Sequence, residues 1–207
     1  MKEIIPVVIM CLVFVLGSMK VWAIEEPEYT LLLQEEQYEL RDYSPYIIAE
    51  TFVDAGFEEA GTIAFRSLFN YISGDNQSRT EVVMTAPVSQ QGSGEEISMT
   101  APVSQKASGG RWLVSFTMPG MYTMDSIPKP NDPLVQIRQV ERQRMAAIRY
   151  TGLWRENSYQ SNKQALDAWI EAQGLKVTGE AVWARYNAPF SLWFLRRNEI
   201  LIPVSTD

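Results

Sequence analysis

The chain has 207 residues, a formal net charge of −7, no histidine and one cysteine, Cys11. The acidic balance argues against binding to nucleic acid or to anionic lipid. The absence of histidine and the single cysteine exclude imidazole and most thiolate chemistry, together with the common zinc sites. We therefore predict no catalytic residue and no metal-binding residue.

The first 23 residues have the pattern of a secretory signal peptide. Lys2 precedes an apolar stretch from Ile4 to Leu16, and a short polar segment then leads to Ala23. The apolar stretch is shorter than the roughly 20 residues that span a membrane. We expect cleavage after Ala23, export to the periplasm or to the outside of the cell, and a single mature domain over 24–207 without membrane contact. A retained N-terminal anchor is the alternative.

The first half of the mature chain contains strand, strand, helix and strand patterns in that order. Alternation of apolar and charged residues predicts a strand at Tyr38–Arg41, and a turn leads to a second at Tyr46–Val53. A helix follows over Gly56–Ile72, with Asp54 as N-cap and Gly74 past its end. Two more strands are predicted at Val82–Val88 and Trp112–Met118.

The second half repeats this order. Strands are predicted at Leu134–Val140 and Met145–Tyr150, a helix at Ser158–Gln173 with Asn157 or Ser158 as N-cap, and final strands at Ala181–Tyr186 and Ile200–Val204. The pseudo-repeats cover about 36–118 and 134–204, and a proline-rich connection at 119–133 joins them. This order is typical of an α+β domain in which two helices cover an antiparallel sheet or open barrel.

A seven-residue segment occurs twice. Met84–Gln90 recurs identically as Met99–Gln105, with a polar Gly- and Ser-containing segment between the copies. We interpret one copy as a strand and the other as a surface duplicate. Competition of both copies for one place in the sheet is the alternative, because repeated patterns specify strand register weakly.

The first predicted helix has more apolar surface than the second. Its sheet-facing stripe, from Phe57 to Tyr71, is accompanied by a second stripe about 100° around the helix axis, formed by Gly61, Phe65, Phe69 and Ile72. The second helix has one narrow stripe. Either the Met118–Met124 segment or a bound apolar ligand is expected to cover the surplus, and ordinary core packing is the alternative.

The sequence resembles the SOUL haem-binding protein family, which has a GyrI-like βαββ-repeat architecture. The resemblance covers nearly the whole mature chain. It rests on segments in the family's order: Tyr38–Arg41, Phe69–Gly74, Met84–Val88, Ser115–Pro119, Tyr122–Pro133, Arg149–Gly152 and Tyr186–Phe190. It implies two βαββ repeats that form a distorted antiparallel β-barrel flanked by two helices.

The resemblance also implies a shallow tetrapyrrole site on the first helix. The apolar contact positions fall on Phe65 and Phe69, and we add Ile72 and the nearby Arg66 as candidates, together with Met118, Met121 and Tyr122 from the connection. The family's basic positions fall on Thr62 and Asn70, which are uncharged, and its proposed histidine iron ligand has no counterpart. Haem would therefore bind weakly or without coordination of its iron.

Three functional hypotheses remain open. The first is a non-enzymatic binder of haem, another tetrapyrrole or a similar hydrophobic small molecule. The second is a hydrolase of small apolar substrates with a Glu or Tyr as acid–base, which requires a closed pocket and a carboxylate of raised pKa. The third is a protein-interaction module that uses the same apolar stripe, for example in a homodimer.

Overall fold

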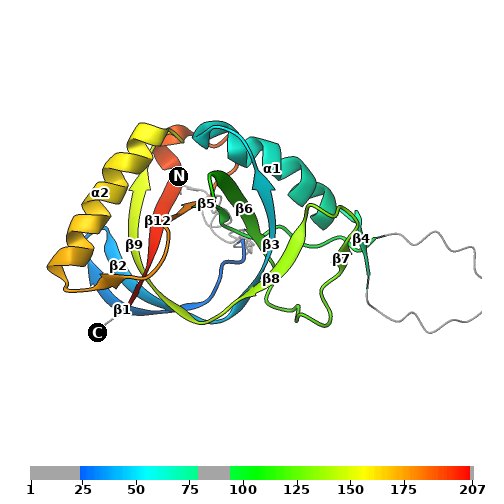
Figure 1. Cartoon of the computed structure of the whole chain (residues 1–207), viewed down its shortest axis with the longest axis horizontal. Helices are drawn as coiled ribbons and strands as arrows, with labels where there is room; N and C mark the ends of the chain where they lie inside the picture. Colours follow the sequence, from blue (N-terminus) through cyan, green and yellow to red (C-terminus); the bar gives the residue numbers. More distant parts are fainter. Residues whose placement is uncertain (1–23, 79–93, 206–207) are drawn as a thin grey trace, which may run out of the picture.

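The protein is an α+β molecule in which two helices lie against one face of a large, strongly curved antiparallel sheet (Figure 1). The computed structural model describes residues 24–78 and 94–205. The helices are α1 (Phe57–Ile72) and α2 (Glu156–Ala172), with a short 3-10 helix η1 (Trp193–Leu195). The strands are β1 (Tyr29–Glu35), β2 (Tyr38–Tyr43), β3 (Tyr46–Val53), β4 (Asn76–Gln77), β5 (Val103–Ser108), β6 (Arg111–Thr117), β7 (Lys129–Pro130), β8 (Gln136–Val140), β9 (Gln143–Thr151), β10 (Lys176–Val177), β11 (Val182–Arg185) and β12 (Arg197–Ser205).

The strand order is symmetric about the pairing of β5 with β11. It runs β1-β2-β9-β12-β11-β5-β6-β3-β8, and β10 pairs with β12. The first strand of each half pairs with the second strand of the other half, because β2 lies beside β9 and β8 lies beside β3. Each half therefore completes the sheet of the other.

The expected barrel is not closed. Among the described residues β1 and β8 are the two edges of the sheet, and no pairing joins them. The α+β class and the two flanking helices are as predicted, but β1 was not anticipated. It pairs along the whole of β2 and occupies the edge of β2 that a closed barrel would need. The result is an open sheet with a concave inner face.

Both helices pack on the convex face (Figure 1). Helix α1 buries Ala60, Ala64 and Leu68 over β3 and β6, and α2 buries Leu166 and Ile170 over β9 and β12. The small residues of α1 let its backbone approach the sheet closely. The N-cap positions are Gly56 and Arg155, neither with a side-chain cap, so the expected caps at Asp54 and at Asn157 or Ser158 are wrong. Gly74 ends α1 with φ +106°, as its glycine predicts.

The duplicated segment is described only in its second copy, of which Val103–Gln105 begins β5. The first copy and the predicted strand Val82–Val88 lie outside the described residues. The proline-rich connection contains only the two-residue strand β7. No helix within 24–78 and 94–205 is long and apolar enough to cross a membrane.

Candidate ligand-binding sites

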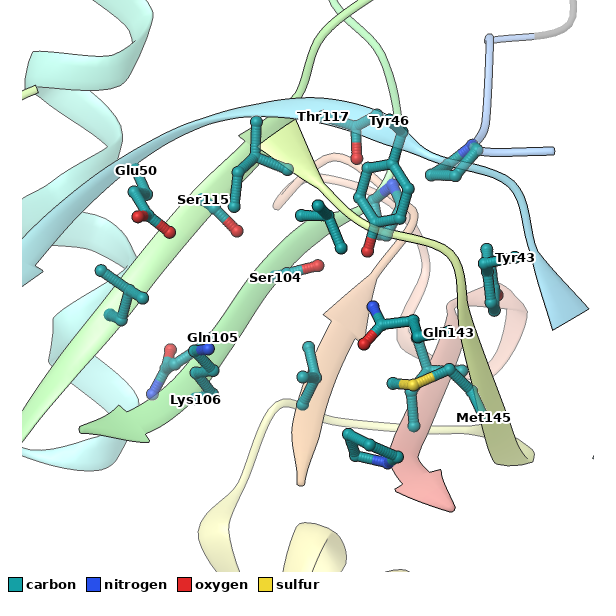
Figure 2. A pocket seen from close by; sticks show the side chains of 18 of the residues that line it. Tyr43, Tyr46, Glu50, Ser104, Gln105, Lys106, Ser115, Thr117, Gln143 and Met145 are labelled. Atoms are coloured by element: carbon teal, nitrogen blue, oxygen red, sulfur yellow. The ribbon is translucent and has the colours of Figure 1, made fainter. Parts of the chain in front are cut away.

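The concave face of the sheet contains a cavity of about 190 Å³. Figure 2 shows side chains from several strands directed into it, among them Tyr46, Glu50, Ser104 and Ser115. The cavity lies on the opposite side of the sheet from α1 and α2. None of the site residues predicted from the sequence lines it, because all of them belong to α1 or to the segment after β6.

A row of polar side chains crosses the floor of this cavity. Ser104 on β5 is paired with Ser115 on β6, and Ser115 is paired with Glu50 on β3. Paired residues of antiparallel strands have their side chains on the same face, so the three form one line across three strands. The Glu50 carboxylate accepts two hydrogen bonds of 2.8 Å from Arg138 on β8. The floor of the cavity therefore presents two hydroxyl groups beside a carboxylate whose charge is balanced by Arg138.

The walls of the cavity are apolar and aromatic. Among the described residues, those that line it include Tyr43, Tyr46, Ile48, Leu113, Val140, Met145, Val182 and Leu201. Glu26 and Pro27, from the first described segment, line the same cavity, and Glu26 is held there by a 2.8 Å ion pair with Arg197. An apolar wall around a few convergent polar groups is the usual composition of small-molecule sites.

A buried ion pair lies beside the cavity on the same face. Arg41 on β2 donates to Glu199 on β12 at 2.7 and 3.2 Å, and the two residues are 1% and 0% exposed. Arg41 also donates to the Tyr43 hydroxyl at 2.9 Å, and the Tyr186 hydroxyl donates to Glu199 at 2.9 Å. Tyr43 and Tyr186 both line the cavity. The pair therefore fixes two of its aromatic walls.

The charges of this cluster are stabilised by one another. Burial alone would raise the pKa of Glu199, but its hydrogen bonds and charge interactions with Arg41, the charge of Arg197 and the Tyr186 hydroxyl together lower it. Burial raises the pKa of Tyr43, so both tyrosines beside the pair stay protonated at neutral pH. A carboxylate of lowered pKa is a poor general acid.

The second candidate site is the predicted apolar stripe on α1. The rings of Phe65 and Phe69 are stacked, with centroids 5.4 Å apart and an interplanar angle of 14°. Phe65 is half-buried and its ring meets the edge of Phe116, whereas Phe69 is 43% exposed. The described residues therefore cover only part of the stripe, and a flat aromatic surface is left on the helix.

The other sequence-predicted residues have different environments. Ile72 and Met118 are buried in the core beneath α1, so they support this surface but have little area to offer a ligand. Arg66 is exposed. Met121 is 80% exposed and does not pack back on the domain as expected, whereas Tyr122 packs against the core and donates to Glu95 at 2.6 Å.

The residues on α1 fit the ring system of a tetrapyrrole better than its iron. The stacked phenylalanines supply an apolar platform for a macrocycle. The chain has no histidine, and the described residues contain no group of three or more Cys, Asp or Glu that could hold a metal ion. A haem bound here would be held by its rings and its side groups.

The concave cavity was not predicted from the sequence, although the residue pattern of β6 is consistent with a partly polar face. Within β6 the residues facing α1 are large (Trp112, Val114, Phe116), and the alternating ones include two hydroxyl residues, Ser115 and Thr117. This alternation shows a strand with one apolar and one partly polar face. It does not show which other strands bring Glu50 and Ser104 to the same place.

The protein has an α+β fold made of two βαββ-type halves. Comparison with known proteins identifies its family. Residues 24–203 match the model of the SOUL heme-binding protein family. Because the match covers most of the sequence, the chain belongs to the SOUL heme-binding protein family. None of the curated proteins compared with the sequence matches it.

Solved structures share the fold at low sequence identity. The crystal structure of the EcmrR C-terminal domain is 10% identical with a TM-score of 0.60, and the alignment covers 83% of this chain and 98% of that one. A crystal structure described as a hydrolase from Listeria innocua is 11% identical with a TM-score of 0.54, over 84% of this chain and 94% of that one. At these identities the likeness establishes the architecture alone.

Proposed function

We propose that the protein is a non-catalytic binder of a small amphipathic molecule in the concave cavity of its sheet. The observation that carries this proposal is the polar row Ser104–Ser115–Glu50 across the floor of an otherwise apolar cavity. A ligand with an apolar body and one hydrogen-bonding group matches this arrangement. Membership of a family named for haem binding supports small-molecule binding in general.

The size of the cavity favours a ligand smaller than a tetrapyrrole. Its volume of about 190 Å³ is below the range of roughly 300–1,000 Å³ that is typical of sites for drug-sized ligands. The ionisation of the cluster supports binding rather than hydrolysis, because Glu199, the most buried carboxylate beside the cavity, has a lowered pKa and is already bonded to Arg41. Neither cavity serine has a histidine base, since the chain contains none.

A titration with 2-naphthol tests this proposal, because the probe has a compact apolar body and one hydroxyl. We expect saturable binding to the wild type. Ser115→Leu should weaken it at least tenfold by filling the floor and removing its hydroxyl, whereas Ser98→Leu, at an exposed serine, should change it less than twofold. Absence of saturable binding at millimolar probe, or equal binding by wild type and Ser115→Leu, would sink the proposal.

A tetrapyrrole on α1 is the second candidate function. The stacked pair Phe65–Phe69, with the Phe69 ring partly in solvent, is the observation that favours it. Because the chain has no histidine and the described residues contain no group of three or more Cys, Asp or Glu that could hold a metal ion, the affinity should reside in the macrocycle. Hemin and metal-free protoporphyrin IX should therefore bind with dissociation constants within about threefold of each other.

Parallel titrations of both compounds, followed by Soret absorbance and tryptophan quenching, check this expectation. Phe69→Ser should weaken both, and Ile63→Ser, which removes another exposed apolar side chain of α1, should weaken neither. Hemin bound more than tenfold tighter than protoporphyrin would show that the chain ligates the iron, contrary to the proposal. Absence of a Soret change with both compounds would exclude tetrapyrrole binding at α1.

We further propose that the protein is exported with residues 1–23 removed. The support is the sequence pattern that ends at Ala23. The intact mass of the protein recovered from the native host should correspond to a chain that begins at Ile24. A mass that retains the N-terminal segment would contradict cleavage.

A further inference from the structure

Arg185, near the end of β11, is buried without an ionic partner. It is 8% exposed, and among the described residues no carboxylate lies within salt-bridge distance of its guanidinium. Its guanidinium carbon lies 4.8 Å from the ring centroid of Trp183 and 5.3 Å from that of Trp154, and its Nε has no hydrogen-bond partner. Buried charges are normally paired, so this arrangement requires an explanation.

The surroundings of Arg185 have a surplus of hydrogen-bond donors. The Trp183 indole N–H and the Tyr150 hydroxyl are buried beside it and interact with each other, but neither makes a hydrogen bond of normal geometry. Among the described residues, Gln105 Oε1 on the adjacent strand is an unpartnered acceptor. Burial lowers the pKa of Arg185 to about 10, since its charge is desolvated without compensation by a carboxylate. It stays protonated at neutral pH. Positive charge with excess donors is the complement of an anionic acceptor group.

Helix α1 connects this charge to the apolar stripe. A Cβ at Gly61 would overlap the terminal nitrogens of Arg185, so the guanidinium lies directly against the helix backbone there. Gly61, Phe65 and Phe69 follow one another at intervals of four residues and therefore lie along one side of the helix. With a rise of 1.5 Å per residue, Phe65 and Phe69 are about 6 and 12 Å further along the axis from Gly61. An apolar platform thus begins next to a buried cation.

We propose that Arg185 binds the carboxylate or other anionic group of an amphipathic ligand whose apolar body lies on Phe65 and Phe69. This site is on the opposite face of the sheet from the cavity. It rests on the second candidate function only in its use of the same α1 surface, and it defines the ligand class more narrowly as an organic acid with a flat apolar body.

Neighbouring charges favour this assignment. Arg196 lies over the ring of Trp154, the same indole that Arg185 approaches, and donates only to the backbone carbonyls of Pro189 and Ser191. A second guanidinium that has no carboxylate partner within the described part of the chain therefore lies close by. The two carboxylates of α1 are in its first turn, and Glu58 is turned toward the Glu156 N–H of α2 at 3.4 Å.

Two fluorescent probes with the same ring system test the proposal. 8-Anilinonaphthalene-1-sulfonate carries an anionic group, and N-phenyl-1-naphthylamine lacks it. Arg185→Gln should weaken binding of the sulfonate at least tenfold and change binding of the neutral amine less than twofold. Phe69→Ser should weaken both, and Arg142→Gln, which removes an exposed charge in the turn between β8 and β9, should affect neither.

Gly61→Ala is the second variant, because it displaces the guanidinium while all charges remain, and it should also weaken the sulfonate selectively. Thermal melting of each variant establishes that it is folded. Equal effects of Arg185→Gln on both probes, or no effect on either, would overturn the proposal, as would a wild type that binds neither. Loss of both probes in Ser115→Leu but not in Phe69→Ser would place them in the cavity and overturn this site while the cavity proposal stands.

Discussion

Two buried arginines, one on each face of the same sheet, differ in what surrounds them. On the concave face Arg41 donates to Glu199, Glu39 and the Tyr43 hydroxyl, and its pKa is raised because these bonds outweigh the burial that would lower it. On the convex face Arg185 lies between two indole rings, no carboxylate of residues 24–78 or 94–205 pairs with it, and its pKa is lowered by burial. Both guanidinium groups are buried, but they differ in the number of hydrogen-bond acceptors around them.

This contrast indicates how one fold can hold two kinds of site. Where a buried charge is fully paired, it organises its neighbours, as Arg41 and Glu199 fix the tyrosines of the cavity. Where a buried charge has no partner within the protein, it can form an ion pair with a ligand.

Replacement of Arg41 should have the largest effect on stability. Arg41→Met leaves the Glu199 carboxylate buried with only Arg197 and the Tyr186 hydroxyl to compensate it, so the free energy of unfolding should fall by about 3–5 kcal/mol. Urea unfolding followed by tryptophan fluorescence measures this. Lys163→Met, which breaks the more exposed pair with Asp167 on α2, is the control and should cost about 0–1 kcal/mol. Similar losses in both variants would contradict the assigned importance of the buried pair.

Acid should destabilise the protein partly through Glu199. Its pKa in the folded protein is lowered from the ordinary value of 4.5. The stability that Glu199 contributes is therefore complete above about pH 4.5 and is lost as the pH falls through the lower folded pKa. Glu199→Gln should be less stable at pH 7 and should lose less stability between pH 5 and 3. Asp42 contributes in the same window, because its hydrogen bond to Arg144 lowers its pKa as well. Parallel acid limbs for the two proteins would contradict the expectation.

Gly61→Ala should be destabilising although alanine is the better helix former. The added methyl group would overlap the Arg185 guanidinium, and such overpacking costs about 1–3 kcal/mol against a propensity gain of about 0.5–1 kcal/mol. In the Arg185→Met background the penalty should be smaller, since a thioether adapts more readily than a planar guanidinium. A double-mutant cycle by denaturant unfolding measures the coupling, and additive effects would show that the two residues do not interact.

Replacement of Arg185 should have the smallest effect. Arg185→Met removes a buried charge that has no carboxylate partner and retains an apolar chain, so the free energy of unfolding should change by less than about 1 kcal/mol or increase. The comparison with Arg41→Met is direct, since both substitutions are the same. A loss as large as that of Arg41→Met would mean that Arg185 is paired and structural, and it would weaken the anion site.

Much of the fold could be predicted from local patterns. Strand β3 has the predicted bounds, and α1 and α2 differ from prediction by one or two residues at their ends, because periodicity and end signals are local. Strand β1 was missed since its side chains are largely exposed and do not alternate in polarity. The open edge between β1 and β8 was not foreseen because strand pairing depends on contacts between distant parts of the chain.

The candidate sites also differ in how far they could be predicted from local sequence patterns. The stripe Phe65–Phe69 was readable because residues four apart on a helix are neighbours wherever the helix lies. The polar row in the cavity needs the registers of β5, β6 and β3, which are separated by long stretches of sequence. Arg185 in isolation reads as one residue of a short strand. Trp183 is two residues before it, but Gly61 and Trp154 come from distant parts of the chain. These distant contacts, and the lack of a carboxylate partner among the described residues, cannot be read from the sequence around Arg185.

The exchange of strands between the halves has a consequence for the order in which the molecule forms. When synthesis has reached only β6, strand β2 lacks its partner β9 and strand β3 lacks its partner β8. The first half therefore cannot complete its sheet by itself. The last strand, β12, lies between β9 and β11 and connects β1, β2 and β9 to the rest of the sheet. Folding must therefore wait for nearly the whole chain, and fragments ending before Arg197 should remain substrates for chaperones and proteases rather than accumulate as stable half-molecules.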